Sequence, residues 1–269
     1  MPEIYIISGF LGVGKTTLIE GVVQSTQEPF FLIENEAGDK AIDGNQIRKK
    51  GQIQVVNLLS GCICCSLLEE FKQTLKDHQD EEIILVEPTG IAQVSRIRTG
   101  LKEFPSLYVV TIVDPVDVLS HEEDCGSYYQ DQIQSADTVI INVRGNCDTS
   151  QAEQVVNQLN PFARLYSLDL SQVCLSRKDL RFASKNQLIQ DQQNLDPLQV
   201  ETVMIEGADF ADREALQASV YTSLVDLKVR RVKGHARVSD QTYKIDYASG
   251  RWSYTPVDHG ELGLVVIWG

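Results

Sequence analysis

Glycine, lysine and threonine recur in the stretch Gly9-Phe-Leu-Gly-Val-Gly-Lys-Thr-Thr17 at a spacing suited to phosphate. The stretch fits the pattern G-x-x-x-x-G-K-S/T in full, which predicts that it binds a nucleoside triphosphate. Its glycines let the backbone turn tightly and direct N–H groups inward at the positive end of a helix. Lys15 is predicted to reach the β- and γ-phosphates, and the Thr16 hydroxyl to hold Mg²⁺. The predicted nucleotide-binding residues of this loop are Gly9, Gly12, Val13, Gly14, Lys15, Thr16 and Thr17.

A second polar segment, Glu87-Pro-Thr-Gly90, follows the apolar run 83–86. A carboxylate in this position holds Mg²⁺, usually through water, so Glu87 is predicted to share the ion with Thr16. The Gly90 N–H is predicted to touch the γ-phosphate and to report its loss. Taken alone, the tetrapeptide is more typical of an ordinary exit from a strand, and the phosphate loop reverses that preference.

Three cysteines are crowded into Cys62-Ile-Cys-Cys65, which indicates a metal or redox site. In an extended chain Cys62 and Cys64 share one face and Cys65 points away, so a local bend decides which thiols converge. The following Ser66-Leu-Leu-Glu69 fits a capping box, and a helix N-terminus favours the thiolate form. Soft thiolates prefer Zn²⁺, Cu⁺ or Co²⁺ to Mg²⁺. Buried structural cysteines and a redox pair are the alternatives.

Acidic residues between the phosphate loop and the cysteine segment are candidates to complete a metal site or to position Mg²⁺. Glu36 is predicted to join the transition-metal site, and Asp43 is a weaker candidate. A solvated acidic loop explains the same residues equally well.

The elements that position these residues alternate between apolar and amphipathic runs. This alternation predicts an α/β fold, a mainly parallel sheet flanked by helices on both faces. The run 4–8 enters the phosphate loop as a strand, and 17–24 leaves it as a helix. Further predicted strands are 30–33, 53–58, 83–86, 107–114, 138–142 and 163–168, with a helix over about 67–76.

The composition changes near residue 176, where Asn, Gln, Asp, Lys and Arg dominate up to 199. We therefore predict a nucleotide domain over 1–175, a polar and partly helical linker over 176–199, and a small α+β domain over 200–269. In the last domain, a helix over 212–225 has Asp209 or Asp212 as its cap. Its predicted strands are 200–205, 227–238, 242–248, 252–257 and 264–268, with a turn at 249–250.

Charge and hydropathy limit the classes of partner. The formal net charge of −14 argues against nucleic acid, which requires a surplus of Lys and Arg. No apolar run approaches the roughly 18–20 residues that span a bilayer, and no basic-then-apolar signal begins the chain. The sequence therefore predicts a soluble, cytoplasmic protein with no membrane partner.

Together these residues resemble the CobW family of metal-chaperone GTPases, which is related to the nickel-insertion GTPases of urease and hydrogenase maturation. The resemblance continues through Leu159-Asn-Pro with Ala163, and through Arg231-Val-Lys-Gly234. It implies a P-loop fold and a GTPase whose thiolates take up Zn²⁺ or Co²⁺ in the GTP-bound state. Hydrolysis would then release the ion to a client metalloprotein, and a homodimer is a further expected partner.

The chain departs from the family pattern at the base site. Family members carry N-K-x-D, whose Asp accepts hydrogen bonds from guanine, whereas this chain reads Asn142-Val-Arg-Gly145. Only Asn142 matches, so it is the predicted base-site residue, and Asp148, three residues after Gly145, is a candidate substitute for the missing acid. The choice of GTP over ATP is therefore open. The His-rich segment of many members is also missing.

The predicted catalytic residues are Lys15, Thr16 and Glu87, and the predicted cofactors are GTP, Mg²⁺ and Zn²⁺ or Co²⁺. Because Ile91 and Ala92 follow Gly90, no glutamine is evident to orient the attacking water. We therefore expect slow intrinsic hydrolysis, raised by metal, dimerisation or a client. The main alternative is a nucleotide-dependent protein assembly factor with structural cysteines, using GTP or ATP. A small-molecule kinase ranks last, since no acceptor site is evident.

Overall fold

A computed structural model of the chain describes residues 1–25, 28–35, 53–58, 63, 67–120, 126–145, 147–183, 201–222, 229–248 and 250–268. The chain divides into two compact units, Met1–Leu195 and Asp196–Gly269. The dividing point falls inside the segment 176–199 that the sequence predicts as a linker. The first part of that segment forms helix α8 (Arg177–Leu180), which belongs to the first unit.

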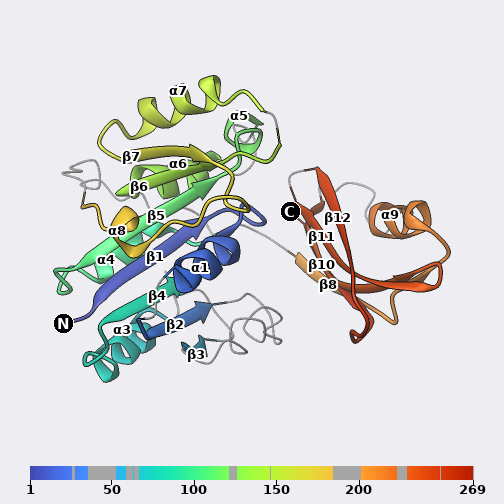
Figure 1. Cartoon of the computed structure of the whole chain (residues 1–269), viewed down its shortest axis with the longest axis horizontal. Coiled ribbons are helices and arrows are strands. Elements are labelled where there is room, and N and C mark those ends of the chain that lie inside the picture. The colour runs from blue at the N-terminus through green and yellow to red at the C-terminus, as the bar shows by residue number, and fades with distance from the viewer. Residues whose placement is uncertain are drawn as a thin grey trace. The chain divides into compact units, whose positions relative to one another are not determined.

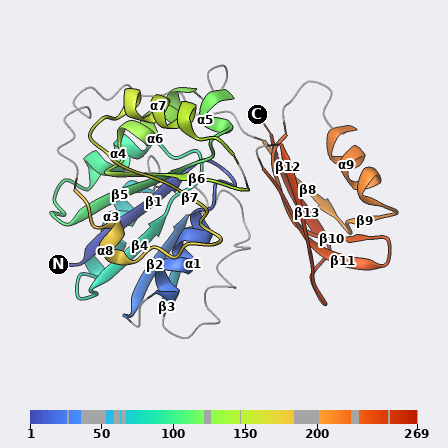
Figure 2. The same ribbon diagram turned by 45° about the horizontal axis from the view of Figure 1, so that its top comes forward.

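Among the described residues, a seven-stranded sheet forms the centre of the first unit (Figures 1 and 2). Its order is β3-β2-β4-β1-β5-β6-β7, and every pair of neighbours is parallel. The predicted α/β fold is confirmed. The strands are β1 (Glu3–Gly9), β2 (Phe30–Asn35), β3 (Ile53–Leu58), β4 (Ile83–Glu87), β5 (Leu107–Val113), β6 (Thr138–Asn142) and β7 (Arg164–Leu168).

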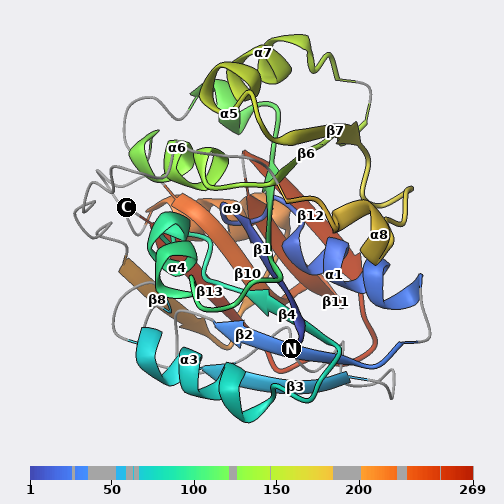
Figure 3. The ribbon, with the colours of Figure 1, turned by 90° about the vertical axis from the view of Figure 1, so that its left-hand side faces the viewer.

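Helices cover this sheet on both faces, so its central strands are buried on each side, as a parallel sheet requires. α1 and α8 lie on one face, and α3, α4, α6 and α7 lie on the other (Figure 3). β1 is therefore a continuous apolar strand that ends at the phosphate loop. The helices are α1 (Lys15–Gln24), α3 (Leu68–Asp77), α4 (Val94–Gly100), α5 (Asp117–Ser120), α6 (Gly126–Gln134) and α7 (Ser150–Leu159).

Two carboxylates fix α4, the helix that follows the Glu87–Gly90 segment. Asp131 of α6 accepts hydrogen bonds from the backbone N–H groups of Val94 at 2.7 Å and Ser95 at 3.2 Å, which satisfies free donors at the start of α4. Asp137, which is fully buried, forms a bidentate ion pair with Arg98 of α4 at 2.8 and 2.9 Å. These contacts hold the exit of the Glu87–Gly90 segment on the sheet.

The second unit is a mostly antiparallel sheet with a helix against one face (Figures 1 and 2). Its order within the described residues is β12-β11-β10-β13-β8, and the short β9 pairs in parallel with β10. The predicted α+β class is confirmed. The elements are β8 (Glu201–Glu206), β9 (Asp209–Phe210), α9 (Arg213–Thr222), β10 (Val229–Val238), β11 (Gln241–Ala248), β12 (Arg251–Pro256) and β13 (Gly263–Trp268).

Local residue types set the boundaries of this unit. Asp212 accepts a hydrogen bond from the Ala215 N–H at 2.7 Å and caps α9, as predicted. Gly250 has a φ of 74° in the predicted turn between β11 and β12. Alternate residues of β10 and β13 point inward, so the buried cluster under α9 contains Leu216, Val220, Val232, Ala236, Ile245, Leu264, Val266 and Trp268. No helix in the described parts of the chain is long and apolar enough to cross a membrane.

Candidate nucleotide and metal site

The loop between β1 and α1 adopts a backbone of the kind that cradles phosphate. Gly9, Gly12 and Gly14 have φ angles of 137°, 78° and 112°, which other residues rarely adopt. At Gly14 an added Cβ would also lie 2.7 Å from Asn142 Nδ2, so no side chain fits there. Gly14 is the N-cap of α1, and the loop therefore ends at the positive end of that helix.

Lys15 and Thr16 begin α1 beside this loop. Lys15 is 7% exposed, and its Nζ donates to the carbonyl oxygens of Gly9 at 3.0 Å and Phe10 at 3.2 Å. The Thr16 hydroxyl lies 3.4 and 3.5 Å from the two carboxylate oxygens of Glu87. The structure therefore brings the ammonium, the hydroxyl and the carboxylate predicted from the sequence to one edge of the sheet. Val13 is buried in the loop and Thr17 is exposed.

Gly90 packs directly against the phosphate loop. An added Cβ would lie 2.7 Å from Leu11 Cδ2 and 2.9 Å from the Leu11 backbone nitrogen. On its other side, the buried Gln132 of α6 donates from Nε2 to the Gly90 carbonyl at 3.0 Å and to the Ala92 carbonyl at 3.3 Å. This glutamine, which the sequence analysis did not identify, fixes the predicted sensing segment at the loop.

The end of β2 carries two buried polar residues that sequence reasoning left without a role. Glu34 pairs in register with Glu87 on the neighbouring β4, so both side chains belong to the same edge. Asn35, 2% exposed, donates from Nδ2 to the Leu58 carbonyl at 2.9 Å and accepts from the Ile63 N–H at 3.2 Å. The feature of the sequence that could have indicated them is the pair of polar residues directly after the apolar run 30–33.

Ile63 is the described residue of the cysteine segment. It is fully buried, and its backbone N–H is bound to Asn35. Within the described residues, no group of three or more His, Cys, Asp or Glu could hold a metal ion. The predicted transition-metal ligands all lie outside those residues: Glu36, Asp43, Cys62, Cys64 and Cys65.

Asn142 joins the phosphate loop to the neighbouring strand ends. It is 4% exposed and donates from Nδ2 to the Val13 carbonyl at 2.8 Å, while its Oδ1 accepts from the Leu170 N–H at 3.1 Å. Arg144, two residues later, donates to the Gly12 carbonyl. Asp148 accepts from the Ser150 N–H at 2.9 Å at the start of α7. The sequence analysis did not predict that Arg144 contacts the phosphate loop. The only indication in the sequence was a positively charged residue two positions after Asn142.

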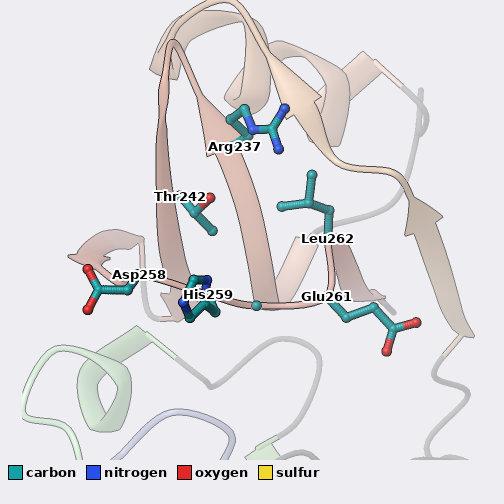
Figure 4. Close-up of a pocket in the computed structure, with 7 residues that line it drawn as sticks. Arg237, Thr242, Asp258, His259, Glu261 and Leu262 are labelled. Atoms are coloured by element: carbon teal, nitrogen blue, oxygen red, sulfur yellow. The ribbon is translucent and has the colours of Figure 1, made fainter.

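The second unit contains a pocket of about 580 Å³, which opens between β10, β11 and the segment before β13. Figure 4 shows the side chains around it. Arg237 lies at this pocket and pairs with Asp209 at 3.4 Å. None of the described residues that line it is predicted from the sequence to bind nucleotide or metal. The lining residues are Arg237, Thr242, Asp258, His259, Gly260, Glu261 and Leu262.

The curated proteins that this chain resembles are named as zinc chaperones or as zinc-regulated GTPase metalloprotein activators. Over 193 residues the chain is 26% identical to the zinc chaperone CobW of Sinorhizobium sp., covering 58% of this chain and 54% of the relative. It is 28% identical over 173 residues to the zinc-regulated GTPase metalloprotein activator 1 of Schizosaccharomyces pombe, covering 57% and 41%. A solved structure, the Zn(II)-bound YjiA GTPase of E. coli, is 15% identical with a TM-score of 0.47 and covers 100% of this chain and 94% of its own.

The chain spans about half the length of these curated relatives. The model of the CobW/HypB/UreG nucleotide-binding domain matches residues 3–167, which include the phosphate loop, Glu87 and Asn142. The resemblance inferred from the motifs is confirmed. Because the match takes in more than half of the chain, this protein belongs to the CobW/HypB/UreG family through its nucleotide-binding domain.

Proposed function

We propose that this chain binds and hydrolyses GTP, holds a zinc or cobalt ion at the Cys62-Ile-Cys-Cys65 thiolates, and releases that ion to a client metalloprotein. The family match and the relatives named as zinc chaperones support this function. The observation that carries it is a continuous path of contacts between the phosphate loop and the cysteine segment.

The path begins at Thr16, whose hydroxyl faces the Glu87 carboxylate at 3.4 Å. Glu87 on β4 pairs in register with Glu34 on β2, and Asn35 is the next residue of β2. The Asn35 amide then binds the N–H of Ile63, the residue between Cys62 and Cys64. Energetic coupling between sites can travel through connected contacts of this kind, so we propose that nucleotide state reaches the thiols along this path.

On the nucleotide side, the backbone N–H groups of the loop bind the phosphates. Lys15 exchanges the carbonyl oxygens of Gly9 and Phe10 for phosphate oxygens, and its charge stabilises the negative charge that develops during hydrolysis. The Thr16 hydroxyl and the Glu87 carboxylate are hard oxygen donors within 3.5 Å of each other, which suits Mg²⁺. When bound, Mg²⁺ neutralises phosphate charge.

Intrinsic hydrolysis is proposed to be slow. Gln132, the glutamine that contacts the sensing segment, uses its amide to hold the Gly90 and Ala92 carbonyls. It is therefore committed to the segment and not to orienting the attacking water. Metal, a second copy of the chain or a client protein is proposed to raise the rate.

On the metal side, thiolates from Cys62, Cys64 and Cys65 supply soft ligands, and Glu36 adds an oxygen ligand. Asp43 is a weaker candidate. α3 begins at Leu68 and its N-cap is Leu67, not the Ser66 of the predicted capping box. Its positive end follows the last cysteine closely in the sequence and is proposed to favour thiolate over thiol.

Cobalt binding tests this function, because thiolate-to-Co²⁺ charge transfer absorbs in the near ultraviolet. We would titrate Co²⁺ into the protein with Mg-GTP, Mg-GDP, Mg-ATP or no nucleotide. We expect tight binding with Mg-GTP alone, and loss of the absorption band when Cys64 and Cys65 are both replaced by Ser. The Lys15→Ala variant should retain the cysteines but lose the response to GTP.

The other outcomes identify other functions. An equal response to Mg-ATP would keep the metal chemistry and change the nucleotide. A cobalt band of equal strength with every nucleotide and with none would show that metal binding is not coupled to the nucleotide state. No band under any condition would leave a nucleotide-dependent assembly factor with structural cysteines.

A further inference from the structure

Recognition of guanine needs an acceptor for its N1–H and N2–H groups, and Gly145 stands where the N-K-x-D pattern would supply one. We infer that Asp169, from the loop after β7, supplies that acceptor and makes the site selective for guanine. The inference rests on the proposed function, because it identifies the residue by which the same site would select GTP.

The sheet brings Asp169 to the correct edge. β6 and β7 are parallel neighbours, Asn142 pairs in register with Leu168, and the Val143 N–H donates to the Leu168 carbonyl at 2.9 Å. Asp169 therefore leaves β7 beside the residues that leave β6. In parallel α/β sheets, ligands bind at this carboxyl edge.

Contacts then tie the loop of Asp169 to the phosphate loop. The Leu170 N–H donates to Asn142 Oδ1 at 3.1 Å, and the Asn142 amide donates to the Val13 carbonyl at 2.8 Å. Leu170 also packs at the start of α1, since a Cβ added to Gly14 would lie 3.6 Å from its Cδ1. The residue next to Asp169 is thus fixed against the loop that holds the phosphates.

Arg144 provides a second link between the same parts. Its guanidinium donates to the Gly12 carbonyl, and its positive charge also favours the ionised form of Asp169. Arg144 therefore contacts the phosphate loop and also stabilises the negative charge of the Asp169 carboxylate.

The Asp169 carboxylate is ionised and oriented. Ser171 donates to its Oδ1 from the hydroxyl at 2.6 Å and from the backbone N–H at 2.8 Å. These hydrogen bonds, followed by the charge of Arg144, lower the pKa of Asp169 below its ordinary value of 3.8. Both bonds go to Oδ1, so within the described residues Oδ2 remains available to a ligand.

An ionised carboxylate discriminates between the two purines. Guanine presents two neighbouring donors, N1–H and N2–H, whereas adenine presents an N1 lone pair that a carboxylate repels. Asp148 is a second acid in the segments that follow β6 and β7, and its Oδ1 accepts from the Ser150 N–H at 2.9 Å at the start of α7. Among the described residues, no hydrogen bond or ion pair joins Asp148 to Asn142, Arg144 or the phosphate loop, which makes it a matched control.

Xanthine gives the test a readout that loss of stability cannot imitate. It carries a carbonyl at C2 where guanine carries an amino group, so an amide can donate to it where a carboxylate is repelled. We would measure the affinities of the full chain and its variants for Mg-GDP, Mg-XDP and Mg-ADP by calorimetry. In D169N we expect GDP affinity to fall about 100-fold and XDP affinity to rise above that of the wild type. D148N should match the wild type with all three nucleotides.

A second variant separates support of the carboxylate from recognition of the base. S171A keeps the Asp169 carboxylate but removes its hydroxyl partner, so GDP affinity should fall only a few-fold, without any gain for XDP. A D169N protein that prefers GDP as the wild type does would overturn the inference. A D169N protein that has the thermal stability of the wild type but gains no affinity for XDP would also overturn the inference. A wild type that binds ADP as well as GDP would instead remove guanine selectivity from the proposed function itself.

Discussion

At the scale of single residues, Gly90 lies so close to Leu11 of the phosphate loop that there is no room for a side chain. In Gly90→Ala the new Cβ would lie 2.9 Å from the backbone nitrogen of Leu11, so the phosphate loop must move. Displacements of this size cost catalysis far more than folding, and we expect kcat/KM for GTP to fall roughly 10- to 100-fold. Steady-state hydrolysis assays check this. The control is Gly21→Ala in α1, where the nearest atoms are 3.9 Å away and activity should be unchanged.

Asn35 is the residue through which we expect the metal site to be positioned. Asn35→Ala removes the acceptor of the Ile63 N–H and the donor to the Leu58 carbonyl, which should destabilise the protein by about 1–3 kcal/mol. The segment between Cys62 and Cys64 then loses its anchor, so Co²⁺ affinity should fall as well. Cobalt titration and urea unfolding measure the two effects separately.

Asn160→Ala is the matched control for that variant. Asn160 is also buried, and its amide donates to the carbonyls of Ile133 at 2.8 Å and Ala136 at 2.9 Å. Its loss should lower stability by a similar amount without changing Co²⁺ binding. Equal losses of cobalt affinity in both variants would show that Asn35 acts through general stability.

At the scale of elements, strands were easier to predict than the links between them. β6 has the bounds that its apolar run gave, because a strand buried on both faces reads as a nearly continuous apolar run. β3 also has the predicted bounds, although it is the edge strand of the sheet and its Gln54 is exposed. α1 begins at Lys15, two residues before the predicted start, because Gly14 already caps the helix. β9 was missed, since two residues carry no periodicity and its partner β10 is far along the chain.

The same limit applies to the candidate site. The phosphate loop, Glu87 and Gly90 were predicted because each lies within one short motif. Asn35 with Ile63, Gln132 with Gly90, and Arg144 with Gly12 are pairs that only the order of the sheet brings together. The roles of the cysteines remain predictions.

The short helix α8 depends on one carboxylate that makes its stability sensitive to acid. Asp179 accepts hydrogen bonds from the Ser176 hydroxyl at 2.6 Å and the Ser176 N–H at 2.8 Å, which lower its pKa below the ordinary value of 3.8. Because the folded state favours the ionised form, this contribution is fully present above the ordinary value. It is lost as the pH falls through the lower pKa of the folded state.

We therefore expect Asp179→Ala to destabilise the protein by about 0.5–1 kcal/mol at neutral pH, a value kept small by solvent screening. The difference between variant and wild type should shrink with acidification and vanish below the pKa of the folded state. Urea unfolding at a series of pH values measures it. A difference that is independent of pH would assign the effect to packing and not to the carboxylate.

At the scale of the whole molecule, each of the two units contains its own sheet and its own buried cluster. Leu216 of α9 is fully buried in the second unit, and Leu75 of α3 is fully buried in the first. Replacing either by Ala removes the same atoms and leaves a cavity, which should cost about 2–5 kcal/mol. We expect Leu216→Ala to lower the stability of residues 201–268 first, and Leu75→Ala that of the nucleotide unit first.

Hydrogen exchange followed by mass spectrometry can assign each loss to its unit, since it reports opening segment by segment. Mg-GDP should raise protection in β1, α1 and β4 of the Leu216→Ala variant as it does in the wild type, because every described residue assigned to the nucleotide lies in the first unit. Leu75→Ala should weaken that response. If both variants instead lost protection equally in both units, the chain would unfold as a single cooperative body, and the second sheet would have to be counted as part of the nucleotide-binding core.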